Sequence, residues 1–327
     1  MTNLRALIIG GNGIISSSVT RLAVHRGFEV TLVNRGQSDT RPGIDGVRRL
    51  TGDATDAGSI AAAIGAEDFD VVVNFRSFLP AQVRADIELF TGRTAQYVYI
   101  SSASAYQKPV AHLPITESTP LRNPHWQYSR DKIASEDALL TAYREHGFPM
   151  TIVRPSHTYD ETLIPVEGGW TALDRMRRGL PVVVHGDGTS LWTLTHSRDF
   201  AVGFVGLLGN PVAVGDTFQI TSDFVYPWDA IYRMLGTALG VEPLLVHVAS
   251  ETIAKAIPAW GPGLLGDKAH SVVFDNSKLR RVVPDFNPTT TFAQGAREIV
   301  AWFDAEPSRR VVDPELDAQL DALAARA

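Results

Sequence analysis

A glycine-rich turn near the start of the chain restricts the fold more than any other feature of the sequence. Gly10-Gly11-Asn12-Gly13 follows a short apolar run, Leu4 to Ile9, and precedes Ile14 to Arg26, where apolar residues recur at helical spacing. Glycine permits a tight turn and a close approach of a ligand to the backbone, and a helix N-terminus favours an anion. A strand, a glycine turn and a helix in this order are typical of a dinucleotide pyrophosphate site.

The turn and the first residues of the helix are therefore the expected cofactor contacts: Gly10, Asn12, Gly13, Ile14 and Ile15. Ser16 stands where a third glycine usually lies in such turns. Because serine is small, we expect the helix and the strand to pack closely all the same. A glycine turn with a purely structural role is the alternative, and the strand and helix around it argue against that role.

Hydrophobic periodicity alternates between strand and helix through the first half of the chain. Strand-like runs are Glu29–Asn34, Val47–Thr51, Asp70–Asn74, Tyr97–Ile100 and Met150–Arg154, and helical runs are Ser59–Ile64, Gln82–Phe90 and Gln127–Glu145. Such alternation predicts a parallel sheet covered by helices on both faces. We expect an α/β fold, a Rossmann-type doubly wound parallel sheet, with residues 1–155 as the NAD(P)-binding domain.

The pattern changes after Arg154, where prolines and tryptophans become frequent and the elements become shorter. Expected strands are Val182–Val184, Trp192–Thr195 and Phe218–Thr221, and expected helices are Arg198–Leu208, Trp228–Leu239 and Phe292–Asp304. We expect residues 156–327 to form mainly a smaller C-terminal substrate-binding lobe, with some segments returning to the Rossmann domain. Leucines at 316, 320 and 323 indicate a short amphipathic helix. A docked helix and a frayed surface helix are equally open.

The composition excludes several kinds of site. The chain has no cysteine, so it forms neither disulfides nor thiol-ligated metal centres. Lys and Arg number 30 against 36 for Asp and Glu, a net charge of −6, so no strong positive field favours a nucleic-acid backbone or an anionic membrane. The N-terminus does not resemble a signal peptide, and no apolar run approaches the roughly 18 residues of a membrane span. We expect a cytoplasmic protein without nucleic-acid or membrane partners.

The end of the second strand bears on the choice between NADP and NAD. An acidic side chain there would favour NAD, but the sequence has Asn34-Arg35-Gly36. A guanidinium suits a 2′-phosphate, so NADP is favoured, with NAD as the alternative if Arg35 stacks on adenine or points to solvent. Asp53, after the third strand, is a candidate for the adenine edge, and Asp56 is a candidate helix N-cap.

A tyrosine and a lysine four residues apart form the candidate catalytic pair. Tyr128 and Lys132 lie on one face of an expected helix. A phenol has a pKa near ~10, and we expect the ammonium to lower the pKa of Tyr128 by stabilising the phenolate. Upstream, a strand runs into Ser101-Ser102-Ala103-Ser104, where a hydroxyl can polarise a substrate oxygen.

These motifs together resemble the extended short-chain dehydrogenases/reductases, the NAD(P)-dependent epimerase/dehydratase family. The resemblance covers nearly the whole chain, through GGNGIIS, Gly52-Asp53, YISSASAY, YSRDK and RPSHTY. It implies that Ser102 polarises the substrate oxygen, that Tyr128 exchanges the proton, and that Lys132 tunes Tyr128 and holds the nicotinamide ribose. It further implies that Ser104 contacts the substrate and that the Pro155 segment lies near the nicotinamide.

Two segments depart from the family pattern. Asn74-Phe75-Arg76-Ser77-Phe78 replaces the usual small pair after the fourth strand, and it resembles an atypical branch that includes chloroplast stem-loop-binding proteins. Ala54, Phe75 and Arg76 are expected near the cofactor, with Arg76 meeting a phosphate or pairing with a surface carboxylate. The Ser102–Ala105 stretch lacks the Asp-Glu pair of 4,6-dehydratases and the Glu of decarboxylases, which disfavours both chemistries.

Histidines and tryptophans supply further candidates. The nine histidines show no metal-ligand spacing, so no metal site is expected. His157 follows the Pro155 segment, and substrate contact and a structural hydrogen bond are equally open. Trp170 and Trp192 are candidates to line a pocket for a ring-bearing substrate, although buried aromatic residues are more often core.

These observations together predict an enzyme that transfers hydride between NAD(P) and a secondary alcohol or ketone carbon. The resemblance implies a small-molecule substrate that is sugar-like or nucleotide-activated. Two alternatives stay open: an epimerase with tightly held NAD, and a non-enzymatic RNA-binding or cofactor-sensing protein, against which the intact Tyr128 and Lys132 argue. A homodimer is also open.

Overall fold

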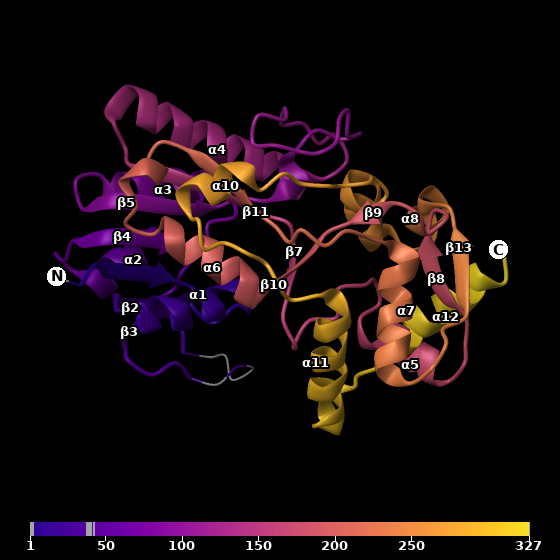
Figure 1. Ribbon diagram of the computed structural model, residues 1–327. Coiled ribbons are helices and arrows are strands. Elements are labelled where there is room, and N and C mark those ends of the chain that lie inside the picture. Colours follow the sequence, from indigo (N-terminus) through magenta and orange to yellow (C-terminus); the bar gives the residue numbers. More distant parts are fainter. Residues whose placement is uncertain (1–2, 37–40, 42, 327) are drawn as a thin grey trace.

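A seven-stranded parallel sheet organises the first half of the molecule (Figure 1). The computed structural model describes residues 3–36, 41 and 43–326. The strand order is β11-β6-β5-β4-β1-β2-β3, and each neighbouring pair is parallel. The strands are β1 (Arg5–Ile9), β2 (Glu29–Asn34), β3 (Val47–Thr51), β4 (Phe69–Asn74), β5 (Thr94–Ile100), β6 (Met150–Pro155) and β11 (Thr217–Ile220). This confirms the expected Rossmann-type α/β fold.

Alternate residues of each strand face opposite sides of this sheet, and helices bury both sides. In β1, Ala6 and Ile8 join the core beneath one set of helices, and Leu7 and Ile9 join the core beneath the other. The first set is α1 (Ile14–His25), α6 (Ser197–Leu207) and α10 (Ser277–Val282). The second set is α2 (Ala57–Ile64), α3 (Pro80–Phe90) and α4 (Gln127–His146). Burial on both faces explains why β1 is a continuous apolar run after Arg5.

The strand order reverses between β1 and β4, and this reversal fixes the place of the site. The chain leaves β1 toward β2 and β3 on one side and continues through β4, β5 and β6 on the other. Ligands of open α/β sheets bind in the crevice at the carboxyl ends of the strands beside such a switch point. The glycine turn, Phe75, Ser101 and Pro155 all lie at these strand ends.

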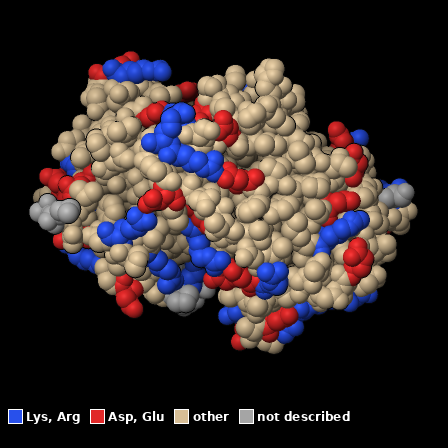
Figure 2. All heavy atoms as spheres, in the orientation of Figure 1, with Lys and Arg blue, Asp and Glu red and all other residues tan. Residues whose placement is uncertain are grey.

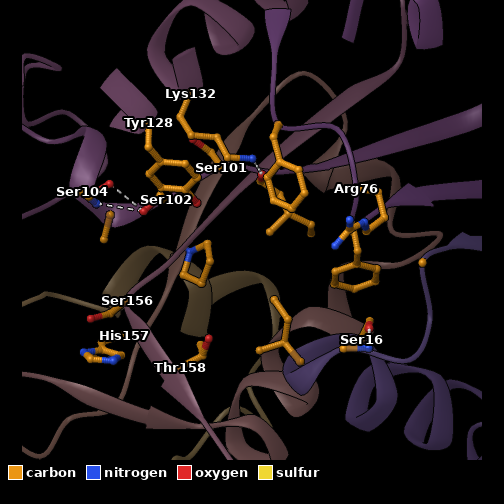
Figure 3. A pocket seen from close by; sticks show the side chains of 18 of the residues that line it. Ser16, Arg76, Ser101, Ser102, Ser104, Tyr128, Lys132, Ser156, His157 and Thr158 are labelled. Carbon is orange, nitrogen blue, oxygen red and sulfur yellow. Dashed lines mark hydrogen bonds between the residues drawn. The ribbon is translucent and has the colours of Figure 1, made fainter. Parts of the chain in front are cut away.

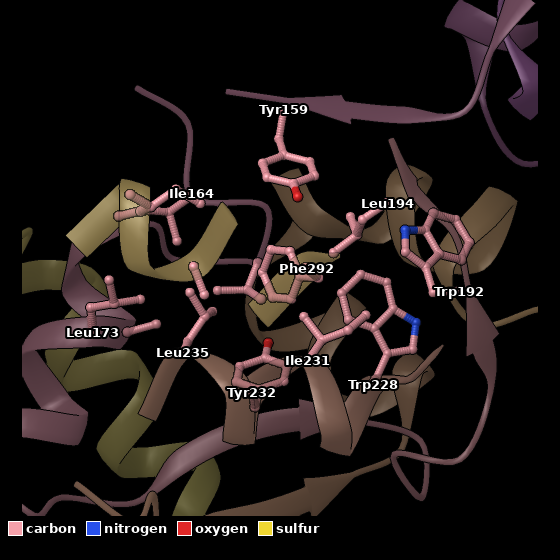
Figure 4. Close-up of a cluster of buried hydrophobic side chains, with 14 of the residues drawn as sticks. Tyr159, Ile164, Leu173, Trp192, Leu194, Trp228, Ile231, Tyr232, Leu235 and Phe292 are labelled. Atoms are coloured by element: carbon pink, nitrogen blue, oxygen red, sulfur yellow. The ribbon is translucent and has the colours of Figure 1, made fainter. Parts of the chain in front are cut away.

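The second half of the chain builds a smaller lobe around its own core, to the right in Figure 1. Aromatic and aliphatic side chains of α5 (Trp170–Arg177), α7 (Trp228–Leu239) and α11 (Phe292–Asp304) form this core (Figure 4). Strands β8 (Val182–His185) and β13 (Leu245–Val248) pair in parallel beside α8 (Ser250–Ala256). Three segments of this half join the central sheet instead: β11 is its edge strand, and α6 and α10 pack on one of its faces.

The C-terminal helix α12 (Pro314–Ala324) is docked on this smaller lobe. Leu320 and Leu323 are buried against β8, β13 and α8. Arg175, fully buried, pairs with Asp317 at 2.5 Å and with Asp321 at 2.6 Å. Of the two alternatives for the leucines at 316, 320 and 323, the docked helix is therefore correct and the frayed surface helix is not. Within the described range, no helix combines the length and the apolar character that crossing a membrane requires.

One expectation for the second half was wrong. The single strand expected over Trp192–Thr195 is two strands, β9 (Leu191–Trp192) and β10 (Leu194–His196). They separate because β9 pairs antiparallel with β12 (Tyr226–Pro227), whereas β10 pairs in parallel with β7 (His157–Tyr159). For Trp170 the core alternative is the correct one, because its ring stacks on that of Phe303 at 5.1 Å inside the core.

Candidate active site

A cavity of about 760 Å³ opens over the carboxyl ends of the central strands and extends to the smaller lobe. Nearly all the residues singled out from the sequence line it: Gly10, Asn12, Gly13, Ile15, Asn34, Arg35, Asp53, Ala54, Phe75, Arg76, Ser102, Ser104, Tyr128, Lys132, Pro155, His157 and Trp192. Ile14, the first residue of α1, is half-buried and is not among the lining residues. The fold thus brings together residues from strand ends far apart in the chain.

The glycine turn has the geometry that the sequence predicts. Gly10 has φ +82° and donates its N–H to the Val33 carbonyl at 3.0 Å. A side chain on Gly10 would meet Cγ of Arg76 at 2.4 Å, so both the φ and the space demand glycine here. Ser16 is buried, and its Oγ accepts the N–H of Gly13 at 2.7 Å. The serine in place of the third glycine therefore helps to hold the turn.

One end of the cavity is lined by the glycine turn and by three charged side chains, Arg35, Asp53 and Arg76. We call it the glycine-turn end. Asp53 accepts the N–H and the hydroxyl of Thr55, and these bonds, with smaller contributions from the two arginines, lower the pKa of its carboxyl. Arg35 is exposed at the end of β2, and the guanidinium of Arg76 lies 5.1 Å from the centre of the Phe78 ring. Two cations thus face this end.

Asp56 has the capping role expected from the sequence. Its carboxylate accepts the backbone N–H groups of Gly58 and Ser59, at 3.1 and 3.2 Å, at the start of α2. The helix N-cap therefore explains Asp56 without any ligand.

Three serine hydroxyls form a chain at the end of β5, and Figure 3 shows two of them, Ser102 and Ser104. Oγ of Ser102 lies 2.9 Å from Oγ of Ser104 and accepts the N–H of Ser104 at 3.1 Å. Ser129 of α4 donates to Oγ of Ser104 at 2.8 Å. Ser104 is buried and tied on both sides, whereas Ser102 is less buried and lines the cavity. Ser102 is therefore the hydroxyl better placed to meet a ligand.

Tyr128 and Lys132 both reach the cavity from α4, but their electrostatics differ from the expectation. Burial raises the pKa of Tyr128, against a lowering effect of the Ser102 hydroxyl, and Asp267 raises the pKa further. The expected lowering by the Lys132 ammonium was wrong, because desolvation of the phenolate raises the pKa and the lowering contribution comes from the Ser102 hydroxyl. The ammonium lies 5.7 Å from the centre of the Tyr128 ring and binds backbone carbonyls instead.

Lys132 is held between two strand ends. Its ammonium donates to the carbonyl oxygens of Ile100 at 2.7 Å and Ser77 at 3.1 Å. Burial lowers the pKa of Lys132 to about 7, and the carboxylate of Glu136 partly opposes that shift. The lysine therefore changes its charge near neutral pH.

Two buried carboxylates, which the sequence reasoning missed, support these strand ends. Glu136 lies one turn after Lys132 on α4. Its carboxylate accepts hydrogen bonds from the hydroxyl of Ser101 and from Nε and Nη2 of Arg154, the latter two at 2.9 and 2.5 Å. It fixes the residue before Ser102. An acidic residue four positions after the lysine was the available signal.

Asp86 of α3 supports the other strand end in the same way. It accepts the amide of Asn74 at 2.8 Å, the hydroxyl of Tyr97 at 2.6 Å and the hydroxyl of Ser77. Burial raises the pKa of Asp86, and its three hydrogen bonds oppose that shift. One buried carboxylate thus holds the unusual Asn74–Phe78 segment through hydrogen bonds. Asp86 occupies a position of α3 where the helical spacing predicts an apolar residue.

The far end of the cavity is built by the smaller lobe and the start of α4. Its lining residues are Trp126, His157, Trp192, Asp267, Lys268 and Phe274. A π-helical turn over Leu264–Lys268 carries Asp267 and Lys268 into the cavity, and the sequence reasoning did not find these two residues. Such turns occur often at functional sites.

His157 and Trp192 form a directed pair at this far end. The indole N–H of Trp192 donates to Nδ1 of His157 at 3.1 Å. Burial, with a smaller contribution from Lys268, lowers the pKa of His157 to about 3. The ring is therefore neutral, and with Nδ1 occupied as an acceptor its proton lies on Nε2. His157 therefore makes the structural hydrogen bond and also lines the cavity, and its contact with a substrate stays a prediction. Across the described residues, no three His, Asp or Glu side chains gather as metal ligands would.

Comparison with known proteins places this site in a family. Residues 6–221 match the NAD dependent epimerase/dehydratase family. A 2'-dehydrokanamycin reductase of Streptomyces kanamyceticus is 27% identical, over 99% of this chain and 90% of the relative. The chloroplast stem-loop binding protein of 41 kDa b of Arabidopsis thaliana is 28% identical, over 74% of this chain and 65% of the relative.

Solved structures agree in fold. An epimerase of Methanothermobacter thermautotrophicus superposes with a TM-score of 0.77 at 15% identity, covering 94% of each chain. A dTDP-glucose 4,6-dehydratase of Bacillus anthracis, solved with NAD, superposes with a TM-score of 0.73 at 19% identity, covering 93% of this chain and 98% of that one.

Proposed function

The chain belongs to the NAD dependent epimerase/dehydratase family, and from this we propose that it is a reductase that transfers hydride from NADPH to a ketone carbon of a sugar-like substrate. One observation carries the proposal. Ser102, Tyr128 and Lys132 line the same cavity as the glycine turn, at the switch point of the sheet. A hydroxyl, a phenol and an ammonium at one cavity wall are the groups that a carbonyl reduction needs.

The glycine-turn end fits a dinucleotide with a 2′-phosphate. Gly10 has a positive φ and lets the Arg76 side chain pack directly over the turn, and α1 begins directly after the turn. Arg35 would hold the 2′-phosphate, Lys132 the nicotinamide ribose, and the Pro155 segment the nicotinamide end. When bound, NADPH supplies the hydride.

The protein's own groups manage the carbonyl oxygen. The hydroxyl of Ser102 donates to this oxygen and polarises the carbonyl. As the carbon accepts hydride, the oxygen gains negative charge and takes the phenolic proton of Tyr128. Burial raises the pKa of Tyr128, so the phenol holds its proton at neutral pH and is ready as the donor. The ammonium of Lys132, 5.7 Å from the ring centre, then stabilises the phenolate.

The reductase and the epimerase proposals differ in how the cofactor is held. An epimerase returns its hydride and gains from a cofactor that stays bound, whereas a reductase releases oxidised cofactor at every turnover. Arg35 supports NADP and hence the reductase, as does the likeness to a 2'-dehydrokanamycin reductase. Several solved relatives hold NAD, which keeps NAD as the alternative.

The test is to desalt the purified protein extensively, record its absorbance spectrum and identify any extracted nucleotide. We expect the nucleotide to be lost and NADPH consumption to appear with members of a ketone panel. Stoichiometric NAD that survives desalting would overturn the reductase and favour the epimerase.

The likeness to a stem-loop binding protein motivates one further control. On the face in Figure 2, Lys and Arg side chains are interspersed with Asp and Glu, which does not favour a polyanion. Filter binding with structured RNA should detect no tight complex. Tight RNA binding without any hydride transfer would reverse the proposal.

A further inference from the structure

The far end of the cavity has a chemistry of its own, distinct from that of the glycine-turn end. Figure 3 shows Ser16 and Arg76 on one side of the cavity, with Ser104 and His157 on the other. Ser102 and Tyr128 lie on this second side in the same view, so the substrate of the proposed reaction must lie there too. The side chains of the far end therefore select the substrate.

Each charge that lines the far end is already matched by an opposite charge. Asp267 lies 2.9 Å from the ammonium of Lys108, a contact of charge rather than a directed hydrogen bond, and Lys108 is fully buried. Lys268 lies 2.9 Å from the carboxylate of Glu167, with both side chains less than a quarter exposed. At the opposite end Arg35 and Arg76 face the cavity together around Asp53. The arginines that could bind phosphate thus lie at the glycine-turn end. At the far end, each charged side chain that lines the cavity is paired with an opposite charge.

The remaining far-end groups suit hydroxyls and the faces of a ring. His157 is a neutral N–H donor, because the Trp192 indole occupies its Nδ1. Asp267 supplies a carboxylate oxygen as an acceptor, so the far end offers both partners that a hydroxyl group needs. Aromatic side chains complete the wall: the rings of Trp126 and Tyr128 lie 5.1 Å apart, and Phe274 also lines the cavity. Aromatic faces bind the C–H faces of rings by burial of apolar surface.

We propose that the far end binds an uncharged polyhydroxylated ring that is not linked to a nucleoside diphosphate. A diphosphate brought here would lose water and meet only ammonium groups that carboxylates already neutralise, which is costly. Ring hydroxyls would instead bind between His157 and Asp267. This inference rests on the proposed reductase and names the substrate class of the same site.

The first test measures nucleotide binding by titration calorimetry on protein saturated with NADP⁺, so that the glycine-turn end is filled. UDP and dTDP are the probes, and neither should bind. Binding of either one that disappears in Lys268→Ala would overturn the inference. This binding measurement does not require turnover. It therefore tests the substrate class even if no ketone is reduced and the proposed function is wrong.

The second test compares ketones on sugar rings with and without a nucleoside diphosphate, with NADPH as the reductant. The free or glycosidic ring should be the better substrate, by kcat/KM, by about tenfold or more, which corresponds to about 1.4 kcal/mol. A nucleotide-linked ketone that reacts faster would contradict the inference while leaving the proposed hydride transfer intact.

Two variants test the charge balance and the directed donor. Glu167→Gln removes the carboxylate that neutralises Lys268, so UDP binding should become measurable. If UDP binding stays undetectable in this variant, the charge argument is contradicted.

Trp192→Phe keeps an aromatic ring but removes the hydrogen bond to Nδ1 of His157. It should raise KM by about 3- to 10-fold with a smaller change in kcat, as expected for one neutral hydrogen bond. Trp170→Phe, in the core of the same lobe, is the matched control, and an equal rise in its KM would contradict the role of the Trp192–His157 pair.

Discussion

The ammonium of Lys132 lies 2.7 Å from the carbonyl oxygen of Ile100, the last residue of β5. Ser102, the candidate catalytic serine, follows two residues later, so the lysine connects α4 to the loop that carries this serine. A second bond to the carbonyl of Ser77 ties it to the end of β4. Lys132 is therefore a candidate catalytic residue, and it also holds together the ends of β4 and β5 beside the site.

Lys132→Met should weaken both turnover and cofactor binding. Methionine fills a similar volume but makes neither the two carbonyl bonds nor a ribose contact, and it leaves a phenolate unsupported. We expect turnover to fall by at least about 100-fold and the Kd for NADPH to rise by about tenfold. Steady-state kinetics and a fluorescence titration with NADPH measure the two effects. Unchanged NADPH affinity would show that Lys132 does not touch the ribose.

The rate of reduction should decline as pH rises through about 7, the pKa to which burial lowers Lys132. Below this pH the lysine is an ammonium that supports the phenolate, and above it the lysine is neutral. Burial raises the pKa of Tyr128, so its phenol keeps its proton across the same range and does not produce this decline. Profiles of kcat against pH for the wild type and Lys132→Arg test the assignment. The arginine stays charged, so a decline at the same pH in both proteins would exclude Lys132 as its source.

Arg35→Ala should weaken binding of NADP and spare NAD. Only NADP carries a 2′-phosphate, and a hydrogen bond to a charged group contributes about 1.5–3 kcal/mol, or a shift in preference of about tenfold or more. Titrations with both nucleotides measure the shift. Equal losses for the two would mean that Arg35 contacts the adenine or the ribose that they share.

Asp86→Ala should destabilise the fold by about 2–5 kcal/mol, because it leaves buried donors of Asn74, Ser77 and Tyr97 without an acceptor. Urea denaturation measures the free energy of unfolding. Glu88→Ala, exposed on the same helix, should change it by less than about 0.5 kcal/mol. If both variants were equally stable, Asp86 would not support the Asn74–Phe78 segment.

The central sheet was predictable because its information is local. A buried parallel strand reads as a continuous apolar run, and the positive φ of the glycine turn is a requirement of the turn itself. The same locality predicted Tyr128 and Lys132 as neighbours on one helix face. The residues of the glycine-turn end followed from their places after β1, β2 and β3.

The supports of the site and its far end were not predictable in this way. Asp86 and Glu136 act through partners that only the folded sheet brings to them. Asp267 and Lys268 sit on a π-helical turn, for which no periodic pattern exists in the sequence. The pKa of Tyr128 was misjudged because an attraction between charges can be read from spacing, whereas the depth of burial cannot.

The most direct test of the account is Tyr128→Phe, which removes one hydroxyl and keeps the ring that packs against Trp126. With NADPH and the best ketone of the panel, we predict that turnover falls by at least about 100-fold, as expected for loss of a positioned proton donor. The Kd for NADPH should stay within about twofold, because the phenol is not needed for the phosphates. Turnover near that of the wild type would contradict the assignment of Tyr128 as the proton donor, and with it the proposed reaction.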